Sequence, residues 1–471
     1  MIMKNIFEGK DCFVKIVEDI SKEFDILKFC ETFKSKYPYL LESSAKGNSL
    51  ARYSILFFKP KRVLEKRKEN SNQSFLKNLD ELFLSEKLNQ KIPNIKQKIN
   101  LPFFGGWFVY LGYELVKEIE TTLKIPESPF SIPTAFVDRV SSSIIFDKLK
   151  EELYFVSDRS KNDILEMLAD YKNIIYEESS IKKKYESKRK SKTKIKLLKK
   201  DSSLKHKIGV EKCIKHIFSG EIFQANLSRL WEFDIKKNTS DIEIYKKLRV
   251  CNPSPFGGLV FLPEGTIISS SPERLIQVQN SKLQTRPIAG TRPRGSSKHA
   301  DAALSKELID SNKEKAEHLM LVDLERNDIS RVCEAGSVKV DEMMVIESYA
   351  HVHHIVSNIT GKLIKNTTPG KIISAVFPGG TITGCPKVRC IEILGDIEKI
   401  GRGPYTGSFG YIGHSGNLDF NILIRSIVRT KDKLFIRAGG GIVADSKPDK
   451  ETLETEAKAN GMLNALNLIN K

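Results

Sequence analysis

Strand-like segments in this chain follow one another in groups, and the expected helices fall between the groups. Apolar and polar residues alternate over 49–60 and over 145–157, as in half-buried antiparallel strands. We expect further strands at 223–233, 257–262, 266–270, 274–278, 407–413 and 433–437. We expect helices at 208–219, 303–323, 369–376, 386–395 and 449–469. Strands in runs predict an α+β fold with antiparallel sheets rather than a doubly wound sheet.

A lysine-rich stretch divides the chain. Residues 176–205 (YEESSIKKKYESKRKSKTKIKLLKKDSSLK) lack large apolar clusters and indicate a solvated linker or an exposed helix. We therefore expect an N-terminal domain over 1–175 and a catalytic domain over 206–471, joined by this linker.

The net charge of +18 raises the question of a nucleic-acid partner. Residues 182–200 hold eleven Lys or Arg and one acid, Glu186, so they carry +10 and the rest of the chain 18 − 10 = +8. No basic motif interleaved with aromatic residues accompanies this run, so we expect no nucleic-acid partner.

The apolar runs and the cysteine positions indicate the cellular compartment of the protein. No apolar run approaches the ~18 residues of a membrane span, and the first residues lack the apolar stretch of a secretory signal. The seven cysteines are scattered and form no CXXC pair, which is typical of a reducing cytosol. We expect a cytoplasmic protein without membrane contact.

Two glutamate pairs, Glu314/Glu317 and Glu451/Glu454, are the clearest chemical signal. Each pair is spaced i, i+3 in an expected helix, so both carboxylates share one helix face. Such a face is often simply solvated. Carboxylates that meet across a pocket need a cation between them, and Mg²⁺ prefers oxygen ligands while keeping positions open for substrate. We expect the two pairs to hold Mg²⁺ against a carboxylate substrate.

Several segments suit an anion. Gly439, Gly440 and Gly441 either let backbone N–H groups approach an anion or form a tight bend. The turn expected at 287–291 offers Gly290 and Thr291 as donors. Arg425, at the end of the strand-like run 421–425, can hold a carboxylate in bidentate fashion, and Tyr405 can donate a phenolic hydrogen bond. The glycine-rich turn before Lys387 and Arg389 resembles a phosphate loop without the Walker spacing.

Two residues are candidates for proton transfer. His354 lies beside His351 and His353, but the spacing fits no familiar zinc pattern, so we expect a neutral His354 that orients substrate or shuttles a proton. For His351 and His353 a structural role is favoured. Glu273, at a strand end after three serines, becomes a proton donor if burial raises its pKa.

Together, nine ordered segments over 205–470 resemble the chorismate-utilising enzymes, which make anthranilate, aminodeoxychorismate, isochorismate or salicylate. The segments are GEIFQANLSR (220–229), SPERL (271–275), PIAGT (287–291), EKAEHLMLVDLERND (314–328), HHIVSNITG (353–361), FPGGTITGCPK (377–387), YTGSFGY (405–411), RAGGGIVADS (437–446) and ETLETEAK (451–458). YLLESS (39–44), RYSI (52–55) and GGWFVYLGYEL (105–115) extend the resemblance more weakly into the first part. It implies antiparallel sheets packed as a sandwich with helices outside.

The resemblance assigns a role to each matching position. Glu317 and Glu454 match the Mg²⁺ carboxylates, and Glu314 and Glu451 match their supporting pair. The positions that match chorismate contacts are Gly290, Thr291, Tyr405, Arg425, Gly439, Gly440 and Gly441. The positions that match catalytic residues are Glu273 as proton donor, His354, Gln224 and Lys458. The positions that resemble an allosteric tryptophan pocket are Glu42, Ser43, Arg52, Pro255 and Phe256, the last two in NPSPF (252–256).

The residue type at Gln224 indicates whether water or ammonia is the nucleophile that attacks chorismate. Relatives that add water to chorismate carry a lysine base here, and a neutral amide cannot act as that base. The resemblance therefore implies ammonia as nucleophile. No segment is left for a glutaminase, so we expect a separate glutamine amidotransferase subunit to supply the ammonia.

Two aminating branches remain open. Ala289 stands where typical aminodeoxychorismate synthases carry the lysine of PIKGT, as in anthranilate synthases. FPGGTITG and the segments YLLESS, RYSI and GGWFVYLGYEL resemble the aminodeoxychorismate type instead. We favour amination to 4-amino-4-deoxychorismate, which serves 4-aminobenzoate and folate synthesis, over anthranilate formation for tryptophan synthesis. An inactive relative or a basic scaffold is the non-enzyme alternative.

Overall fold

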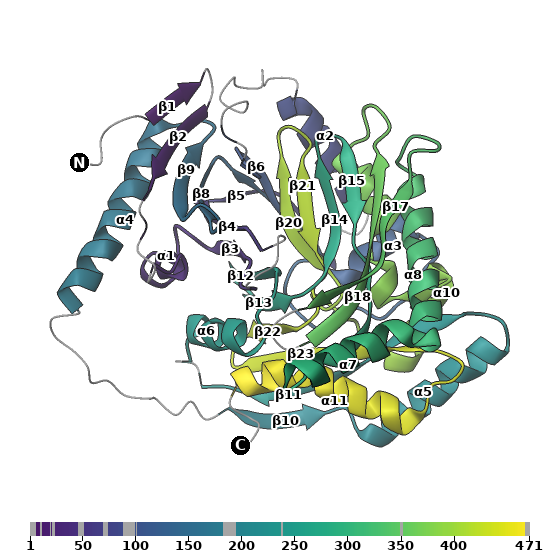
Figure 1. Cartoon of the computed structure of the whole chain (residues 1–471). Helices are drawn as coiled ribbons and strands as arrows, with labels where there is room; N and C mark the ends of the chain where they lie inside the picture. Colours follow the sequence, from purple (N-terminus) through teal and green to yellow (C-terminus); the bar gives the residue numbers. More distant parts are fainter. Residues whose placement is uncertain are drawn as a thin grey trace.

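A computed structural model describes residues 6–9, 12–18, 20, 24–45, 51–68, 74–87, 99, 101–181, 195–236, 239–348 and 352–466 (Figure 1). Of the features predicted above, His351, most of the lysine-rich run (182–194) and the end of the last expected helix (467–469) lie outside these residues.

The larger of two antiparallel sheets has thirteen strands among the described residues. Their order is β1 (Ile6–Gly9), β2 (Cys12–Val17), β9 (Glu152–Ser157), β8 (Ser142–Asp147), β4 (Tyr53–Phe58), β3 (Tyr39–Glu42), β12 (Phe256–Leu262), β13 (Gly265–Ser271), β22 (Ser426–Thr430), β23 (Lys433–Ile442), β11 (Gln224–Asp234) and β10 (Lys196–Lys200). The short β19 (Gly384–Cys385) pairs with the start of β11.

The second sheet has ten described strands. Their order is β16 (Ile288–Pro293), β18 (Val352–Lys362), β15 (Lys282–Thr285), β14 (Arg274–Gln279), β21 (Leu418–Asn421), β20 (Ser408–Gly413), β6 (Gly106–Leu111), β7 (Ala135–Val140) and β5 (Lys61–Lys66), and β17 (Lys339–Ser348) pairs with β18.

Helices lie around the outside of the two sheets (Figure 1). They are α1 (Leu27–Thr32), α2 (Phe75–Lys87), α3 (Val116–Ile119), α4 (Lys161–Ile181), α5 (Ser203–Phe218), α6 (Asp241–Cys251), α7 (Lys298–Asp310), α8 (Asn312–Ser330), α9 (Pro369–Val376), α10 (Lys387–Glu398) and α11 (Pro448–Ala465), with short 3₁₀ turns η3 (Tyr113–Leu115) and η4 (Gly380–Ile382).

The sheets share an aromatic core, which confirms the predicted α+β sandwich. Tyr39 of the larger sheet stacks on Phe108 of the second sheet with ring centroids 4.4 Å apart. Phe57 meets the same ring edge-on at 5.4 Å. Offset and edge-to-face pairs of this kind add to the burial of apolar area that holds stacked sheets together.

Both parts of the chain contribute to both sheets. β3 pairs with β12 in the larger sheet, and β6 pairs with β20 in the second. The predicted domain limits at 175 and 205 therefore do not separate the sheets, and as domain boundaries they remain a prediction. The predicted linker also contains regular structure, because α4 continues to Ile181 and β10 pairs with β11.

Two predicted elements are divided in the structure. The single helix expected at 303–323 is α7 followed by α8, because Ser311 ends the first and caps the second, its Oγ accepting from the backbone N–H of Glu314 at 3.4 Å. The segment 145–157 spans a hairpin, with β8 and β9 joined by a turn at 148–151. Most other predicted strands and helices agree within a few residues.

A buried carboxylate ties together the strands that carry the site. Glu398, at the end of α10, accepts hydrogen bonds from the backbone N–H and the hydroxyl of Ser228 on β11. It also pairs with Arg402 at 2.9 Å and with Arg437 of β23 at 3.3 Å. Burial opposes its charge, but the two guanidinium groups lower the pKa of Glu398 to about 2. The ionised group fixes β11 and β23 against α10.

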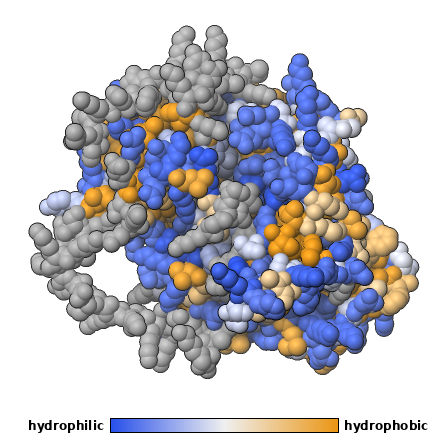
Figure 2. All heavy atoms as spheres, viewed as in Figure 1, coloured by the Kyte–Doolittle hydropathy of each residue, from blue (hydrophilic) through white to orange (hydrophobic). Residues whose placement is uncertain are grey.

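None of the described helices is long and apolar enough to cross a membrane. In the view of Figure 2, polar side chains cover most of the coloured surface, with apolar side chains in scattered groups.

Candidate active site

Three glycines on β23 form the floor of the site. Gly439, Gly440 and Gly441 lie in the strand, paired with residues 226–228 of β11, and do not form the tight bend that was one of the two sequence interpretations. A Cβ on Gly441 would lie only 2.1 Å from Gln224 Nε2, and one on Gly440 would lie 3.3 Å from Glu454 Oε1. A methyl group at Gly441 would therefore displace the Gln224 amide, and one at Gly440 would crowd the Glu454 carboxylate.

Helix α8 brings the first glutamate pair to this strand. Glu317 Oε1 accepts a hydrogen bond from Gln224 Nε2 at 2.9 Å and would lie 3.2 Å from a Cβ on Gly441. Glu314, one turn earlier, pairs with Arg292 of β16 at 3.2 Å. The two carboxylates therefore share one face of α8, as the spacing predicts.

Helix α11 brings the second pair from the other side. Glu454 pairs with Lys458, one turn later, at 2.7 Å, and Lys458 also donates to the carbonyl of Gly439 at 3.1 Å. Glu451 is buried and accepts a hydrogen bond from the Ser446 hydroxyl at 2.7 Å. The α11 carboxylates thus lie along the same glycine strand as Glu317.

The carboxylates of the two helices act on one another electrostatically. Burial raises the pKa of Glu317, and Glu314 and Glu454 add to that rise. Lys458 is an electrostatic neighbour of Glu317 and also of Glu273 and His354. The predicted site residues, which are far apart in the sequence, therefore lie in one region of the structure.

The glutamates lie near one another, but their arrangement is not that of a metal site. Among the described residues, no group of three or more His, Cys, Asp or Glu side chains is arranged to hold a metal ion. Gln224 and Lys458 instead contact the carboxylates of Glu317 and Glu454. The Mg²⁺ ligand set Glu314, Glu317, Glu451 and Glu454 therefore remains a prediction.

Gln224 presents an unused acceptor in this region. It is the first residue of β11 and is almost fully buried, and its Oε1 atom has no hydrogen-bond partner among the described residues. A buried amide oxygen without a partner carries a desolvation cost that a donor on a ligand can remove.

Glu273 is built as a buried acid. It lies between β13 and β14, is 5% exposed, and accepts a hydrogen bond from the Thr381 hydroxyl at 2.7 Å. Burial raises its pKa to about 8, with a smaller contribution from Glu325. The side chain is thus protonated at neutral pH, which is the state that a proton donor needs.

His354 on β18 is a neutral imidazole at neutral pH. Burial lowers its pKa to about 4. Its Nδ1 atom lies 3.0 Å from the Thr291 hydroxyl and 3.3 Å from the Gly290 carbonyl oxygen. Because a carbonyl only accepts, we place the proton on Nδ1. His353, by contrast, contacts Asp301 and Ser348, which agrees with the structural role favoured for it.

The PIAGT segment is a bulged strand, not the predicted turn. Ala289 and Thr291 of β16 pair with successive residues of β18, so Gly290 is the extra residue of a bulge. Its φ of +65° and a Cβ position 2.9 Å from Glu314 Oε2 both require glycine. Ala289 is buried and offers no functional group.

Arg425 and Tyr405 form what we call the polar wall of the site. Arg425 lies in a left-handed conformation directly before β22. The strand that was expected to end at Arg425 ends at Asn421 instead. Within the described part of the chain its guanidinium forms no ion pair, and burial lowers its pKa. Its electrostatic neighbours are Tyr405 and Glu454. A partly buried cation of this kind is suited to a substrate carboxylate.

The segment that resembled a phosphate loop does not present free cations. Lys387 forms an ion pair with Asp328, and Arg389 pairs with Glu221 and Glu392. The segment instead forms η4 and β19, and its Thr381 holds Glu273.

Two contact residues escaped the sequence analysis. Arg292, directly after Thr291, holds Glu314, and Thr381 holds Glu273. Thr381 lies inside the quoted FPGGTITG segment, so the motif marked its position without its partner. Nothing in the spacing of Arg292 connects it with a glutamate 22 residues later.

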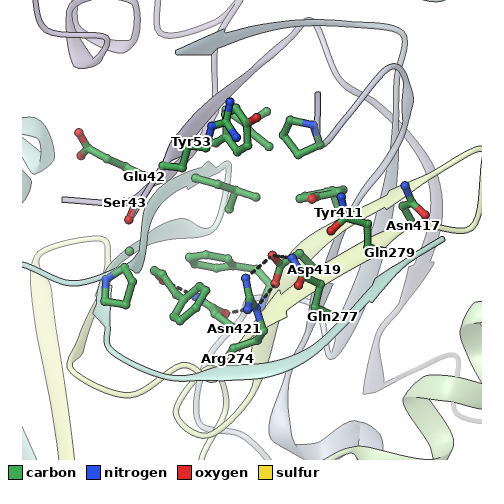
Figure 3. Close-up of a pocket in the computed structure, with 18 of the residues that line it drawn as sticks. Glu42, Ser43, Tyr53, Arg274, Gln277, Gln279, Tyr411, Asn417, Asp419 and Asn421 are labelled. Atoms are coloured by element: carbon green, nitrogen blue, oxygen red, sulfur yellow. Dashed lines mark hydrogen bonds and ion pairs between the residues drawn. The ribbon is translucent and has the colours of Figure 1, made fainter. Parts of the chain in front are cut away.

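A separate cavity of about 410 Å³ lies between the two sheets (Figure 3). All five residues predicted for an allosteric pocket line it. Its apolar lining includes Tyr53, Ile55, Phe256 and Phe409. At one end Arg274 forms a bidentate pair with Asp419, with distances of 2.8 and 2.9 Å.

The polar residues of this cavity differ in their availability. Figure 3 shows the carboxylate of Glu42 directed away from the cavity, where it accepts from Tyr245 at 2.8 Å and pairs with Arg249. Arg52 pairs with Asp147 at 2.6 Å. The hydroxyl of Ser43 is buried and has no hydrogen-bond partner among the described residues.

Comparison with known proteins gives the class. The family model described as chorismate binding enzyme matches residues 36–464. The match covers all the site residues above and every described strand of both sheets except β1 and β2. The chain belongs to this family of chorismate-utilising enzymes.

Individual relatives fall on two branches. The chain is 36% identical over 474 residues to anthranilate synthase component 1 of Acetivibrio thermocellus, covering 96% of this chain and 94% of that protein. It is 49% identical over 263 residues to aminodeoxychorismate synthase component 1 of Bacillus subtilis, covering 55% of each. The crystal structure of anthranilate synthase component I from Streptococcus pneumoniae matches with a TM-score of 0.74 and 31% identity, covering 88% of this chain and 92% of that one.

The glycine floor generates a first prediction. We expect Gly441→Ala to lower kcat/KM for chorismate consumption by about a hundredfold, because the new methyl group would displace Gln224 and Glu317. Absorbance loss of chorismate gives the rate, and a thermal melt checks folding. Gly413→Ala is the matched control, since its Cβ would meet only an ordinary contact at 3.5 Å. Equal rates for Gly441→Ala and wild type would contradict this account of the floor.

Proposed function

We propose that this protein is component I of an aminodeoxychorismate synthase, which replaces the C4 hydroxyl of chorismate by an amino group. The observation that carries the proposal is the 49% identity to the Bacillus subtilis aminodeoxychorismate synthase component over 263 residues, against 36% to an anthranilate synthase component over nearly the whole chain. The FPGGTITG segment favours the same branch.

The proposed reaction consumes chorismate and ammonia and yields 4-amino-4-deoxychorismate and water. Glu273 supplies the proton that the leaving C4 hydroxyl needs, because its raised pKa keeps it protonated at neutral pH. The attacking ammonia loses one proton once its nitrogen is bonded to carbon, so the proton balance closes within each turnover. Ala289 offers no amine, and the reaction proposed here therefore proceeds without a lysine adduct.

Substrate contacts are assigned to the polar wall and the glycine floor. Arg425 and Tyr405 would bind a carboxylate of chorismate, and the backbone N–H groups of Gly439, Gly440 and Gly441 would lie against the ligand. Thr291 and neutral His354 are hydrogen-bonded to each other and orient the substrate ring. Gln224, as a neutral amide, cannot activate water as a base, which favours ammonia as the nucleophile.

Mg²⁺ fits the acidic residues of this site. Glu317 has a pKa raised by burial and by the carboxylates of Glu314 and Glu454, and a cation would relieve that repulsion. Glu317 and Glu454 would hold the ion, and Glu314 and Glu451 would support them. When bound, the ion supplies positive charge that binds the substrate carboxylate and stabilises charge that develops during departure of the hydroxyl.

Ammonia is proposed to come from a separate glutamine amidotransferase subunit, and the cytoplasm is the proposed compartment. The component numbering in the names of the relatives supports a partner for this chain.

Anthranilate synthesis is the alternative function. Buried Ala289 and the 36% identity over nearly the whole chain favour it. Both reactions expel the C4 hydroxyl, so the same acid, Glu273, would serve either one. The product, rather than the site geometry, separates the two functions.

The product assay uses the full chain with chorismate, Mg²⁺ and ammonium chloride. We expect chorismate to disappear without anthranilate fluorescence, and 4-aminobenzoate to form only after an aminodeoxychorismate lyase is added. Boiled protein and a reaction without ammonium are the controls. Fluorescent anthranilate in the absence of the lyase would overturn the proposal in favour of the alternative. Chorismate that stays intact under all conditions would indicate the inactive relative.

The cavity between the sheets is proposed as a tryptophan-binding allosteric site. Its volume of about 410 Å³, its aromatic lining and the unused hydroxyl of Ser43 support a ligand with an apolar body and polar ends. Because Glu42 is already engaged by Tyr245 and Arg249, we expect it to shape the cavity rather than to meet the ligand.

Calorimetric titration of tryptophan tests this site. We expect saturable binding to wild type and at least about tenfold weaker binding to Ser43→Phe, because the added ring fills part of the cavity and removes the hydroxyl. Ser142→Ala, a buried serine of the same sheet outside the cavity lining, is the control and should bind as wild type does. No heat of binding with folded wild-type protein would contradict the assignment.

A further inference from the structure

A second buried carboxyl lies beside the acid of the proposed reaction. Glu325, on α8, is 4% exposed and two helical turns beyond Glu317. Neither the sequence segments nor the proposed chemistry gives it a role. A buried carboxyl in an active site needs either a partner or a function, because burial without compensation is costly.

Glu273 and Glu325 are held by neighbouring residues of η4. The backbone N–H of Gly380 donates to Glu325 Oε1 at 3.3 Å, and the hydroxyl of Thr381 donates to Glu273 Oε1 at 2.7 Å. The two carboxyls, one from α8 and one from the residue directly before β14, thus meet the same short turn.

The contacts of Thr285 indicate that Glu325 carries a proton. The Thr285 hydroxyl lies 3.1 Å from Glu325 Oε2 and 3.1 Å from the carbonyl oxygen of Leu275. That hydroxyl has one hydrogen, and a carbonyl can only accept. Both contacts are full hydrogen bonds only when Thr285 donates to Leu275 and Glu325 donates to Thr285.

Asp328 and Lys387 are charged neighbours of Glu325. Asp328 lies one turn later on α8 and forms an ion pair with Lys387 at the start of α10. Burial, and then the charge of Asp328, raise the pKa of Glu325 to about 7, while Lys387 opposes the rise. Glu325 in turn adds to the rise of the Glu273 pKa. Since the ammonium of Lys387 contacts Asp328, we take Asp328 as the ionised member of this group.

We propose that Glu325 is a positioning residue that acts through Glu273, as the second member of a pair of buried carboxyls on the same turn that keeps the acid protonated. When Glu325 loses its proton, its negative charge disfavours a second charge on Glu273, so the remaining proton stays on the acid. The inference rests on the proposed role of Glu273 as proton donor.

Infrared difference spectroscopy of the full chain tests the pair without turnover. The carbonyl stretch of protonated carboxyls is followed against pH, and its loss in Glu273→Gln identifies the Glu273 band. We expect the Glu273 band to titrate at a pH lower by about one unit in Glu325→Gln, because the like charge is gone. Asp323→Asn, an exposed residue of the same helix, should leave it unchanged. An unchanged band in Glu325→Gln would overturn the proposal.

The pH profile of amination gives a second readout. A lower pKa of Glu273 means that the acid loses its proton earlier as pH rises. We therefore expect the ratio of kcat/KM at pH 6 to kcat/KM at pH 9 to be about tenfold larger in Glu325→Gln than in wild type. In Glu325→Asp, which keeps a carboxyl, this ratio should return most of the way to the wild-type value. An equal loss at both pH values would show a merely structural role and contradict the proposal. If wild type aminates no chorismate, the proposed function fails, and the infrared titration still decides the pair.

Discussion

The site depends on the absence of side chains along one strand. Gly439, Gly440 and Gly441 let Gln224 and the carboxylates of two helices lie close against the backbone of β23, where a Cβ on Gly441 would overlap Gln224 and one on Gly440 would crowd Glu454. Helices α8 and α11 are separated by more than a hundred residues, yet Glu317 of α8 lies against Gly441 and Glu454 of α11 lies against the neighbouring Gly440. The ion pairs of Glu398 with Arg402 and Arg437 hold that strand and its neighbour in place.

Burial then sets the protonation of the groups around this floor. It keeps Glu273 protonated and His354 neutral near pH 7, while Arg425 and Lys458 supply positive charge. An acid, a neutral imidazole and cations in one region of the structure suit a dianionic substrate that must lose a hydroxyl group. Membership of the chorismate-utilising family and this arrangement agree, and the product remains for the assay to decide.

Local patterns predicted the fold well where a segment's own periodicity determines its structure. The strands at 257–262 and 266–270 and the helix at 369–376 match the structure to within one residue at each end. The helix predicted at 303–323 is divided at Ser311. The prediction missed this because it did not recognise the Ser311 hydroxyl as a helix cap. For the three glycines the sequence left an anion-binding backbone and a tight bend open, because it does not show that side chains from distant segments crowd the strand. Arg292 and Glu325 escaped notice because their partners come from distant segments. The resemblance, rather than spacing, brought the cavity residues together.

The most direct test of the central claim is Mn²⁺ binding, as a spectroscopic substitute for Mg²⁺, measured by electron paramagnetic resonance with chorismate present. The variants are Glu317→Gln, Glu454→Gln and the double variant, with exposed Asp449→Asn as control. If the two glutamates bind one ion, each single variant should weaken binding at least about tenfold, and the double variant should be little worse than either. Wild-type affinity in both single variants, or losses that simply add in the double variant, would contradict a shared ion between α8 and α11.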